Sequence, residues 1–204
     1  MLALKAAACL AVVAAVASLR ISKANHPYAV FGAANYVTAV RALLVAVIAG
    51  AIGEPSTPRL SAAVAALGLA VAVMDGVDGL LARRSRMTSA FGARFDMEVD
   101  ALLIMSLSVL AWTFGKAGAW VLASGALRYL FVVAGWIWPW MDRPLEPSRR
   151  RQTVCVIQIV ALIVVVSPLV MPPASTGVAA TALLVLAGSF VVDTWWLYGA
   201  KQVA

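Results

Sequence analysis

The sequence predicts an all-α protein, a polytopic membrane bundle with six core transmembrane helices and one additional helix at the N-terminus. Two observations predict this class. Of the 204 residues, 63% are hydrophobic and only 12% are charged, whereas soluble domains carry about 25% charged residues. Apolar stretches close to the roughly 20 residues that cross a bilayer recur along almost the whole chain. They leave no room for a separate soluble domain.

Interruptions of the apolar pattern define the expected helices. Charged residues, glycine or proline break it at residues 54–55, 84–86, 115, 139–147 and 172–173, and such residues favour turns. Residues 29–204 are therefore assigned to the six-helix core, and residues 1–28 to an N-terminal helix and an interfacial loop. The expected core helices are Ala34–Ile52, Leu60–Leu81, Ala90–Phe114, Ala117–Trp138, Thr153–Val170 and Gly177–Tyr198.

The first apolar run, Leu2–Leu19, allows three interpretations. It can span the membrane, lie at its surface, or act as a cleaved signal peptide, because the Ala-Val-Ala-Ser at its end resembles a cleavage site. We favour a retained helix. Cleavage would export the basic segment that follows it and give every later helix an orientation that conflicts with the charge bias of the loops.

The basic residues gather at one side of the expected helices. The net charge is +7, but Lys and Arg lie in short loops rather than along one extended face, which argues against a nucleic-acid partner. Twelve of the 16 basic residues fall on one side, Lys5, Arg59 and Lys116 fall on the other, and Arg128 lies inside a helix. Because membrane proteins keep such residues on the inner side, the sequence predicts an integral protein of the cell membrane whose basic side faces the cytoplasm.

The acidic residues are concentrated, with five of the nine between positions 75 and 100. Asp75 and Asp78 are three residues apart, and Asp96 and Asp100 are four apart, so each pair projects from one helix face. Two helices joined by a short loop can bring these faces together. Carboxylates that converge near lipid either become protonated or surround a cation. All-oxygen ligands suit Mg²⁺ or Mn²⁺.

Two glycines and an arginine accompany the acids. Gly79 and Gly92 each allow a ligand to approach the helix backbone, or alternatively a neighbouring helix to pack closely. Arg83 can hold a phosphate with two hydrogen bonds, or simply anchor the helix at the inner surface. Together with metal ions, these residues indicate phosphoryl chemistry, in which two metals clamp the attacking and leaving oxygens.

The spacing of these residues is also specific. The pattern Asp75-x-x-Asp78-Gly79-x-x-Ala82-Arg83, eight residues, then Gly92-x-x-x-Asp96-x-x-x-Asp100 resembles the complete signature of the CDP-alcohol phosphotransferase family. The resemblance extends over about 33–198. It implies a six-helix membrane enzyme, commonly a homodimer. Ala34 departs from the family, which often has proline there, and the additional N-terminal helix departs from a six-helix core.

The resemblance also implies a role for each matched residue. The four aspartates would hold two divalent cations, Mg²⁺ or Mn²⁺, and Asp100 would take the proton from the acceptor hydroxyl. The CDP moiety would lie against residues from three segments: Asn35, Thr38, Arg41, Gly79, Ala82, Arg83, Ser89 and Gly92.

The implied reaction moves a phosphatidyl group from a CDP-linked lipid, expected to be CDP-diacylglycerol, to a small polar acceptor and releases CMP, in phospholipid biosynthesis. Arg128 and the run Arg149, Arg150 and Arg151 are candidates for an anion pocket that takes glycerol phosphate or inositol phosphate. They also fit membrane anchors, and serine and choline stay open as acceptors. A cation or proton transporter is the rival class, which would place acids on several helices near mid-membrane.

Overall fold

The computed structural model describes residues 4–7, 33–85, 90–141, 145 and 148–202, with the side chains at 33–34, 77–85, 90 and 200–202 left out. The described part is helical and contains no β-strand, which confirms the all-α class. Its elements are α2 (Ala33–Gly50), α3 (Pro58–Ser85), α4 (Ala90–Thr113), η1 (Ala119–Leu122), α5 (Ala123–Ile137), η2 (Pro139–Met141), α6 (Arg149–Val166) and α7 (Ala174–Gln202).

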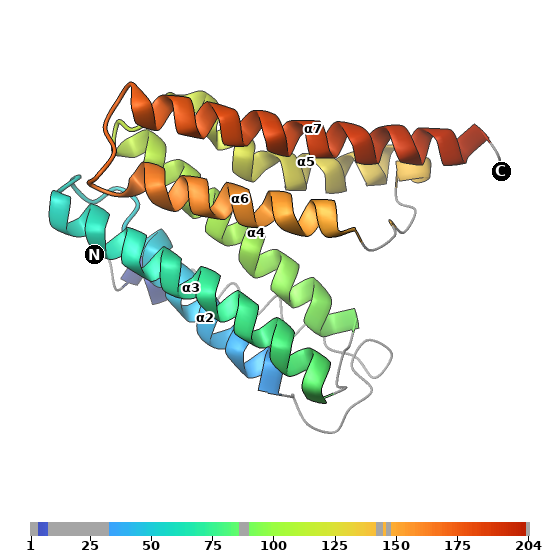
Figure 1. Cartoon of the computed structure of the whole chain (residues 1–204), viewed down its shortest axis with the longest axis horizontal. Helices are drawn as coiled ribbons and strands as arrows, with labels where there is room; N and C mark the ends of the chain where they lie inside the picture. Colours follow the sequence, from blue (N-terminus) through green and yellow to red (C-terminus); the bar gives the residue numbers. More distant parts are fainter. Residues whose placement is uncertain (1–3, 8–32, 86–89, 142–144, 146–147, 203–204) are drawn as a thin grey trace.

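Helix α4 lies at the centre of the bundle. It crosses between the pair α2 and α3 on one side and the group α5, α6 and α7 on the other (Figure 1), and it contacts α2, α5 and α6. Its buried side chains recur every three or four residues, which is the pattern of a helix with one face in the core. They include Val99, Leu103, Leu107 and Leu110. The candidate site residues Asp96 and Asp100 therefore lie on the most central helix.

Local sequence explains most helix ends. The chain leaves α2 through Gly53 and leaves α4 through Gly115, and both have a positive φ, +80° and +68°, which glycine adopts without steric strain. Thr57 Oγ1 accepts a hydrogen bond from the Leu60 backbone N–H at 3.1 Å and caps α3. The breaks expected at 54–55 and 115 are confirmed.

Several predicted helix ends were wrong. Helix α6 ends at Val166 rather than Val170, and α7 runs from Ala174 to Gln202 rather than from Gly177 to Tyr198. The helix expected over Ala117–Trp138 is divided into η1 and α5. Helix α3 continues beyond the expected Leu81 to Ser85, and α6 begins at Arg149 rather than Thr153. Both extensions add arginine-rich turns, which apolar periodicity does not detect. Arginine is nevertheless a good helix former, and its long side chain can reach water from a helix end.

Three described helices contain stretches long and apolar enough to cross a membrane. They are Pro58–Gly76, Ala119–Ile137 and Ala174–Gly199, whereas the apolar part of α2, Asn35–Gly50, is shorter. These helices indicate an integral membrane protein, but the expected count of six spanning helices is not confirmed. The physical reason is that α4 and α6 begin with charged turns, so only their later residues form apolar stretches.

One end of the bundle carries the few basic residues expected on the outer side. Lys5 Nζ donates to the Ile52 carbonyl at 2.9 Å and pairs with Glu54 at 3.2 Å, so residues 4–7 lie against the α2–α3 connection. Lys116 Nζ donates to the carbonyls of Ser167 and Val170 at 3.0 and 2.8 Å, in the α6–α7 connection. The remainder of the predicted N-terminal helix lies outside the described residues.

Close packing of α4 against α5 depends on Gly125. A Cβ added there would lie 2.6 Å from the Met105 Cα, and because this atom belongs to the backbone it cannot move aside easily. We therefore expect Gly125→Ala to destabilise the protein by about 1–3 kcal/mol, the usual range for overpacking, and to lower the melting temperature in detergent. Gly188→Ala is the matched control, because its Cβ would meet nothing within 4 Å. Equal melting temperatures for the two variants would contradict the packing argument.

Candidate functional site

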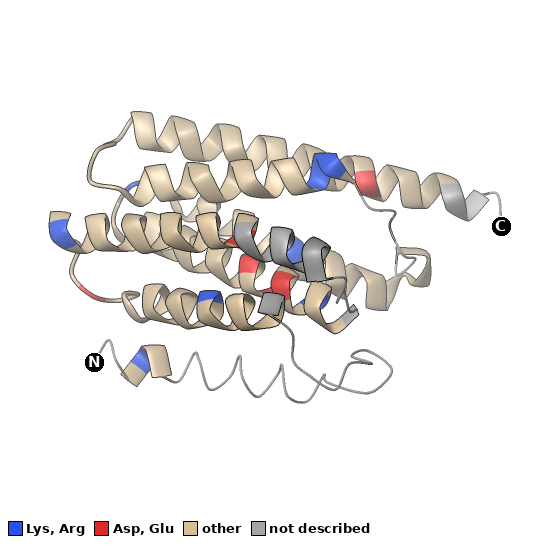
Figure 2. Cartoon of the chain, turned by 60° about the horizontal axis from the view of Figure 1, so that its bottom comes forward, with Lys and Arg blue, Asp and Glu red and all other residues tan. Residues whose placement is uncertain are grey.

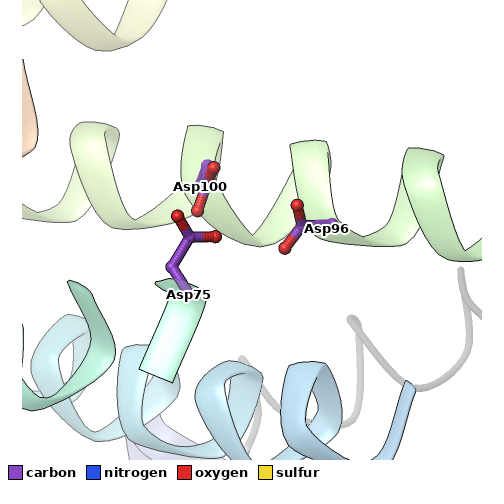
Figure 3. Close-up of side chains that lie close together, drawn as sticks. All are labelled: Asp75, Asp96 and Asp100. Atoms are coloured by element: carbon purple, nitrogen blue, oxygen red, sulfur yellow. The ribbon is translucent and has the colours of Figure 1, made fainter. Parts of the chain in front are cut away.

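Three carboxylates from two helices meet inside the bundle. Asp75 projects from α3 toward Asp96 and Asp100, which lie one turn apart on α4 (Figure 3). Each residue offers one oxygen, and these three oxygens lie within 4.8 Å of one another. The side chains are partly buried, with 31%, 36% and 18% of their surfaces exposed. The cluster is therefore only partly enclosed by the bundle.

The helix register brings Asp75 to this position. It continues the core-facing row of α3 that contains Val64, Gly68 and Val71, all buried and spaced three or four residues apart. Gly68 keeps α3 close to its neighbours, since an added Cβ would lie 3.0 Å from Ile163 Cγ1 and 4.0 Å from Leu107 Cδ2. A larger residue at position 68 would push α3 away from α4 and α6, and Asp75 away from the other acids.

The cluster lies where both helices change from apolar to charged sequence. Residues 60–74 of α3 and 101–113 of α4 include no charged side chain, whereas the remaining turns beside the 85–90 connection are charged. Figure 2 shows a group of acidic positions near the middle of the bundle. Exposed Trp136, Trp138 and Trp195 lie near the ends of α5 and α7, as in the interfacial belts of membrane proteins. This distribution favours a site near the membrane–water boundary over one at mid-membrane.

Arg41 joins the three acids to α2. Its side chain has no exposed surface, and its Nη1 lies 2.9 Å from Asp75 Oδ1 and also pairs with Asp96 Oδ1. Its Nη2 donates to Asp100 Oδ1 at 2.5 Å. One guanidinium thus compensates part of the negative charge of three carboxylates. The sequence assigned Arg41 to the nucleotide and missed these pairs, because no spacing rule relates an arginine on one helix to acids 34 or more residues away.

The buried face of α2 is polar only near the acids. Asn35, Thr38 and Arg41 are buried at intervals of three residues, and the same face continues away from the site with Val45 and Ile48. Buried polar side chains require hydrogen-bonding partners, so this polar half fits the interior of a polar site better than a helix contact in lipid. Asn35 and Thr38, both expected near the nucleotide, therefore lie on the side of α2 that carries Arg41.

The three carboxylates fit a small divalent cation. Mg²⁺ and Mn²⁺ prefer carboxylate oxygens, and two oxygens on opposite sides of Mg²⁺ are about 4.2 Å apart. The three oxygens lie within 4.8 Å of one another, which is close to this spacing. Asp78 lies in α3, whose backbone is helical to Ser85, but its side chain is outside the described ones.

The other residues expected around the donor are described unevenly. Gly79, Ala82 and Arg83 lie in the helical backbone of α3, and their side-chain positions are not described. Ser89 lies outside the described residues. Gly92 is partly buried one turn before Asp96 on α4. The structure therefore brings together Asp75, Asp96, Asp100 and Arg41, and leaves the remaining donor residues as predictions.

Three of the four arginines expected around the acceptor form ion pairs, in two separate groups. Arg128 Nη2 on α5 donates to Glu98 Oε1 on α4 at 2.5 Å. Arg150 and Arg151 on α6 both pair with the buried Asp193 of α7, at 2.5 and 3.2 Å. Arg150 also donates to the Ser189 carbonyl at 2.8 Å and to Ser189 Oγ at 2.5 Å. Arg149 is exposed.

Asp193 is a buried acid on α7 whose two arginine partners both lie on α6. Tyr198, five residues further along α7, packs edge-on against Trp140, with ring centroids 5.8 Å apart. Pairing between α6 and α7 depends on tertiary packing, which spacing within one helix cannot reveal.

Comparison with protein families agrees with this site. The family described as CDP-alcohol phosphatidyltransferase matches residues 31–195, most of the chain. The protein therefore belongs to the CDP-alcohol phosphatidyltransferase family, whose members transfer a phosphatidyl group from a CDP-alcohol to an alcohol acceptor in a membrane. No curated protein and no solved structure matches the chain significantly.

Replacement of one cluster carboxylate tests the candidate metal site. Asp96→Asn removes a charged ligand, so we expect the affinity for Mn²⁺, measured by electron paramagnetic resonance on the purified protein, to fall at least about tenfold. Glu98→Gln is the matched control, because Glu98 lies two residues along the same helix and its carboxylate pairs with Arg128. A similar loss in both variants would indicate a general effect of negative charge rather than coordination by Asp96.

Proposed function

We propose that this protein transfers the phosphatidyl group of CDP-diacylglycerol to a hydroxyl group of a small polar acceptor and releases CMP, as a step of phospholipid biosynthesis. The observation that carries the proposal is the meeting of Asp75, Asp96 and Asp100 from α3 and α4. These residues occupy three of the four aspartate positions of the family signature. The family match favours a transferase over the rival cation or proton transporter.

The proposed reaction is a displacement at phosphorus. Asp100 accepts the proton of the acceptor hydroxyl, whose oxygen attacks the phosphorus that carries the lipid alcohol. A new phosphorus–oxygen bond forms, the bond to the CMP oxygen breaks, and CMP leaves with the bonding electron pair. The partial burial of Asp100 limits competing water at the reacting atoms.

Asp75, Asp78, Asp96 and Asp100 would hold two divalent cations, Mg²⁺ or Mn²⁺, which supply electrostatic stabilisation of the charge that develops on both phosphates. Gly79, Gly92 and the polar face of α2 would line the CDP moiety, and Arg83 would bind its diphosphate. The charge bias supports a site that faces the cytoplasm, where the soluble nucleotide and acceptor meet a lipid tail held in the bilayer. We also propose that the protein forms a homodimer.

Release of CMP measures the proposed activity directly. With labelled CDP-diacylglycerol, a panel of acceptors and purified protein in detergent, we expect CMP release that requires Mg²⁺ or Mn²⁺. Asp100→Asn should lower the rate by about 10²-fold or more, the usual contribution of a general base, while Arg59→Gln on exposed α3 surface leaves it unchanged. Transfer at the normal rate by Asp100→Asn, with metal and donor binding retained, would exclude Asp100 as the base. No release with any acceptor would exclude the transferase.

We further propose a phosphorylated acceptor, such as glycerol phosphate or inositol phosphate, held near Arg149, Arg150 and Arg151. Arg150 and Arg151 both pair with Asp193, and together with Arg149 they concentrate positive charge at the start of α6. The side chains of Arg150 and Arg151 are about one-third exposed, which leaves surface for an anion. Arg128 is a weaker candidate, since it is a single arginine that pairs with Glu98.

Removal of one arginine should separate charged from uncharged acceptors. We expect Arg150→Ala to raise the KM for glycerol phosphate or inositol phosphate by about tenfold or more, because a lost charge-assisted hydrogen bond costs about 1.5–3 kcal/mol. The KM for the CDP-lipid should change little. Unchanged kinetics with every phosphorylated acceptor in both Arg150→Ala and Arg128→Ala would dismiss the anion pocket and leave serine or choline as the better candidates.

A further inference from the structure

Arg41 contacts the atoms that would bind a metal ion. Its guanidinium lies against Oδ1 of Asp75, Asp96 and Asp100, the three carboxylates whose oxygens converge. Because the side chain is fully buried, this guanidinium has exchanged its hydration for the carboxylates. The arginine is therefore the internal counter-ion of the cluster.

A divalent cation and this guanidinium compete for the same carboxylates. A carboxylate oxygen binds Mg²⁺ at about 2.1 Å, and the Arg41 nitrogens lie 2.9 Å from Asp75 Oδ1 and 2.5 Å from Asp100 Oδ1. With both cations on these oxygens, their positive charges would lie within about 5 Å of each other, where repulsion is strong in a partly buried site. The two arrangements therefore exclude or weaken each other.

We propose that Arg41 is a switching counter-ion: binding of the divalent cation releases its guanidinium from the three aspartates, and the released guanidinium binds the diphosphate of the nucleotide donor. This inference rests on the proposed function, which supplies the metal and the donor. Arginine binds phosphate oxygens with the same paired hydrogen bonds that it makes to carboxylates. Arg41 then makes metal loading and donor binding favour each other, as thermodynamic linkage requires.

The position of Arg41 on α2 suits this exchange. Asn35 and Thr38 extend the polar face from Arg41 toward the start of α2, and both are buried. A long side chain rooted at position 41 can rotate along this face without entering lipid. Beyond Arg41 the face becomes apolar with Val45 and Ile48, so among the described side chains of α2 the polar face runs from Arg41 toward the start of the helix.

Removal of the competing charge tests the first half of the switch. We expect Arg41→Gln to bind Mn²⁺ about tenfold or more tightly than the wild-type protein, as measured by electron paramagnetic resonance without substrate. Arg41→Lys keeps a positive charge and should remain close to wild type. Arg59→Gln is the control for net charge, because Arg59 is exposed at the start of α3, and its Mn²⁺ affinity should not change.

The effect of CDP on Mn²⁺ binding tests the second half. CDP should tighten Mn²⁺ binding in the wild-type protein, and the factor should be smaller in Arg41→Gln, because part of the coupling passes through the released guanidinium. The wild-type protein gives an independent readout if a variant folds poorly. Modification of Arg41 by an arginine-specific dicarbonyl reagent, mapped by mass spectrometry, should rise with Mg²⁺ and fall again when CDP is added, while modification of Arg59 stays constant.

Any other result in the metal-binding or the modification experiment would overturn the inference. Equal or weaker Mn²⁺ binding by Arg41→Gln would show that Arg41 orders the acids for the metal instead of competing with it. Constant modification of Arg41 with Mg²⁺ would show that the guanidinium stays on the carboxylates. Either result leaves the proposed transferase intact if CMP release depends on the metal. Absence of saturable Mn²⁺ binding to the wild-type protein would overturn the metal site together with the switch.

Discussion

The concentration of negative charge between α3 and α4 constrains the rest of this structure. Three carboxylates within 4.8 Å in a partly buried place repel one another, and the bundle tolerates them because Arg41 of α2 lies among them. The ion pairs require α2, α3 and α4 to keep one relative register, since a shift by one residue would turn the charged side chains away from each other. Gly68 on the α3 face supports that register by allowing close contact with α6 and α4.

The cluster lies where the helices around it change from apolar to polar or charged residues. The buried face of α2 is polar at Asn35, Thr38 and Arg41 and becomes apolar at Val45 and Ile48. Helices α3 and α4 likewise become apolar with distance from the cluster, on the far side of Asp75 and Asp100. At the opposite end, Lys5 and Lys116 instead satisfy carbonyl groups of the helix connections. At one end of the bundle, charged side chains therefore stabilise the helix connections. Toward the other end they form a charged interior, which suits an enzyme that joins a lipid to a water-soluble group.

Periodicity and spacing within single helices predicted much of this arrangement. The four-residue separation of Asp96 and Asp100 predicted a shared face, and the structure brings both together with Asp75. The shared face of Asp75 and Asp78 stays a prediction, because the side chain of Asp78 is not described. The distribution of basic residues among the loops predicted that Lys5, Arg59 and Lys116 lie on the same side of the bundle. The pairing of Arg41 with the acids and of Arg150 with Asp193 could not be predicted in this way, because each joins helices that are distant in sequence and depends on how they pack. Helix ends rich in arginine were missed because an apolar pattern marks where burial stops, not where backbone hydrogen bonding stops.

The two partly buried charge clusters follow one physical rule with opposite signs. At the acids, the guanidinium of Arg41 lies among three carboxylates. At the α6–α7 contact, the carboxylate of Asp193 lies between the guanidinium groups of Arg150 and Arg151. In each cluster the group of opposite charge reduces a repulsion that would otherwise destabilise the bundle. The proposed function assigns the acids of the first cluster to metal ions and the arginines of the second to a phosphorylated acceptor. In that proposal, the same charged side chains stabilise the contacts between helices and bind the ligands.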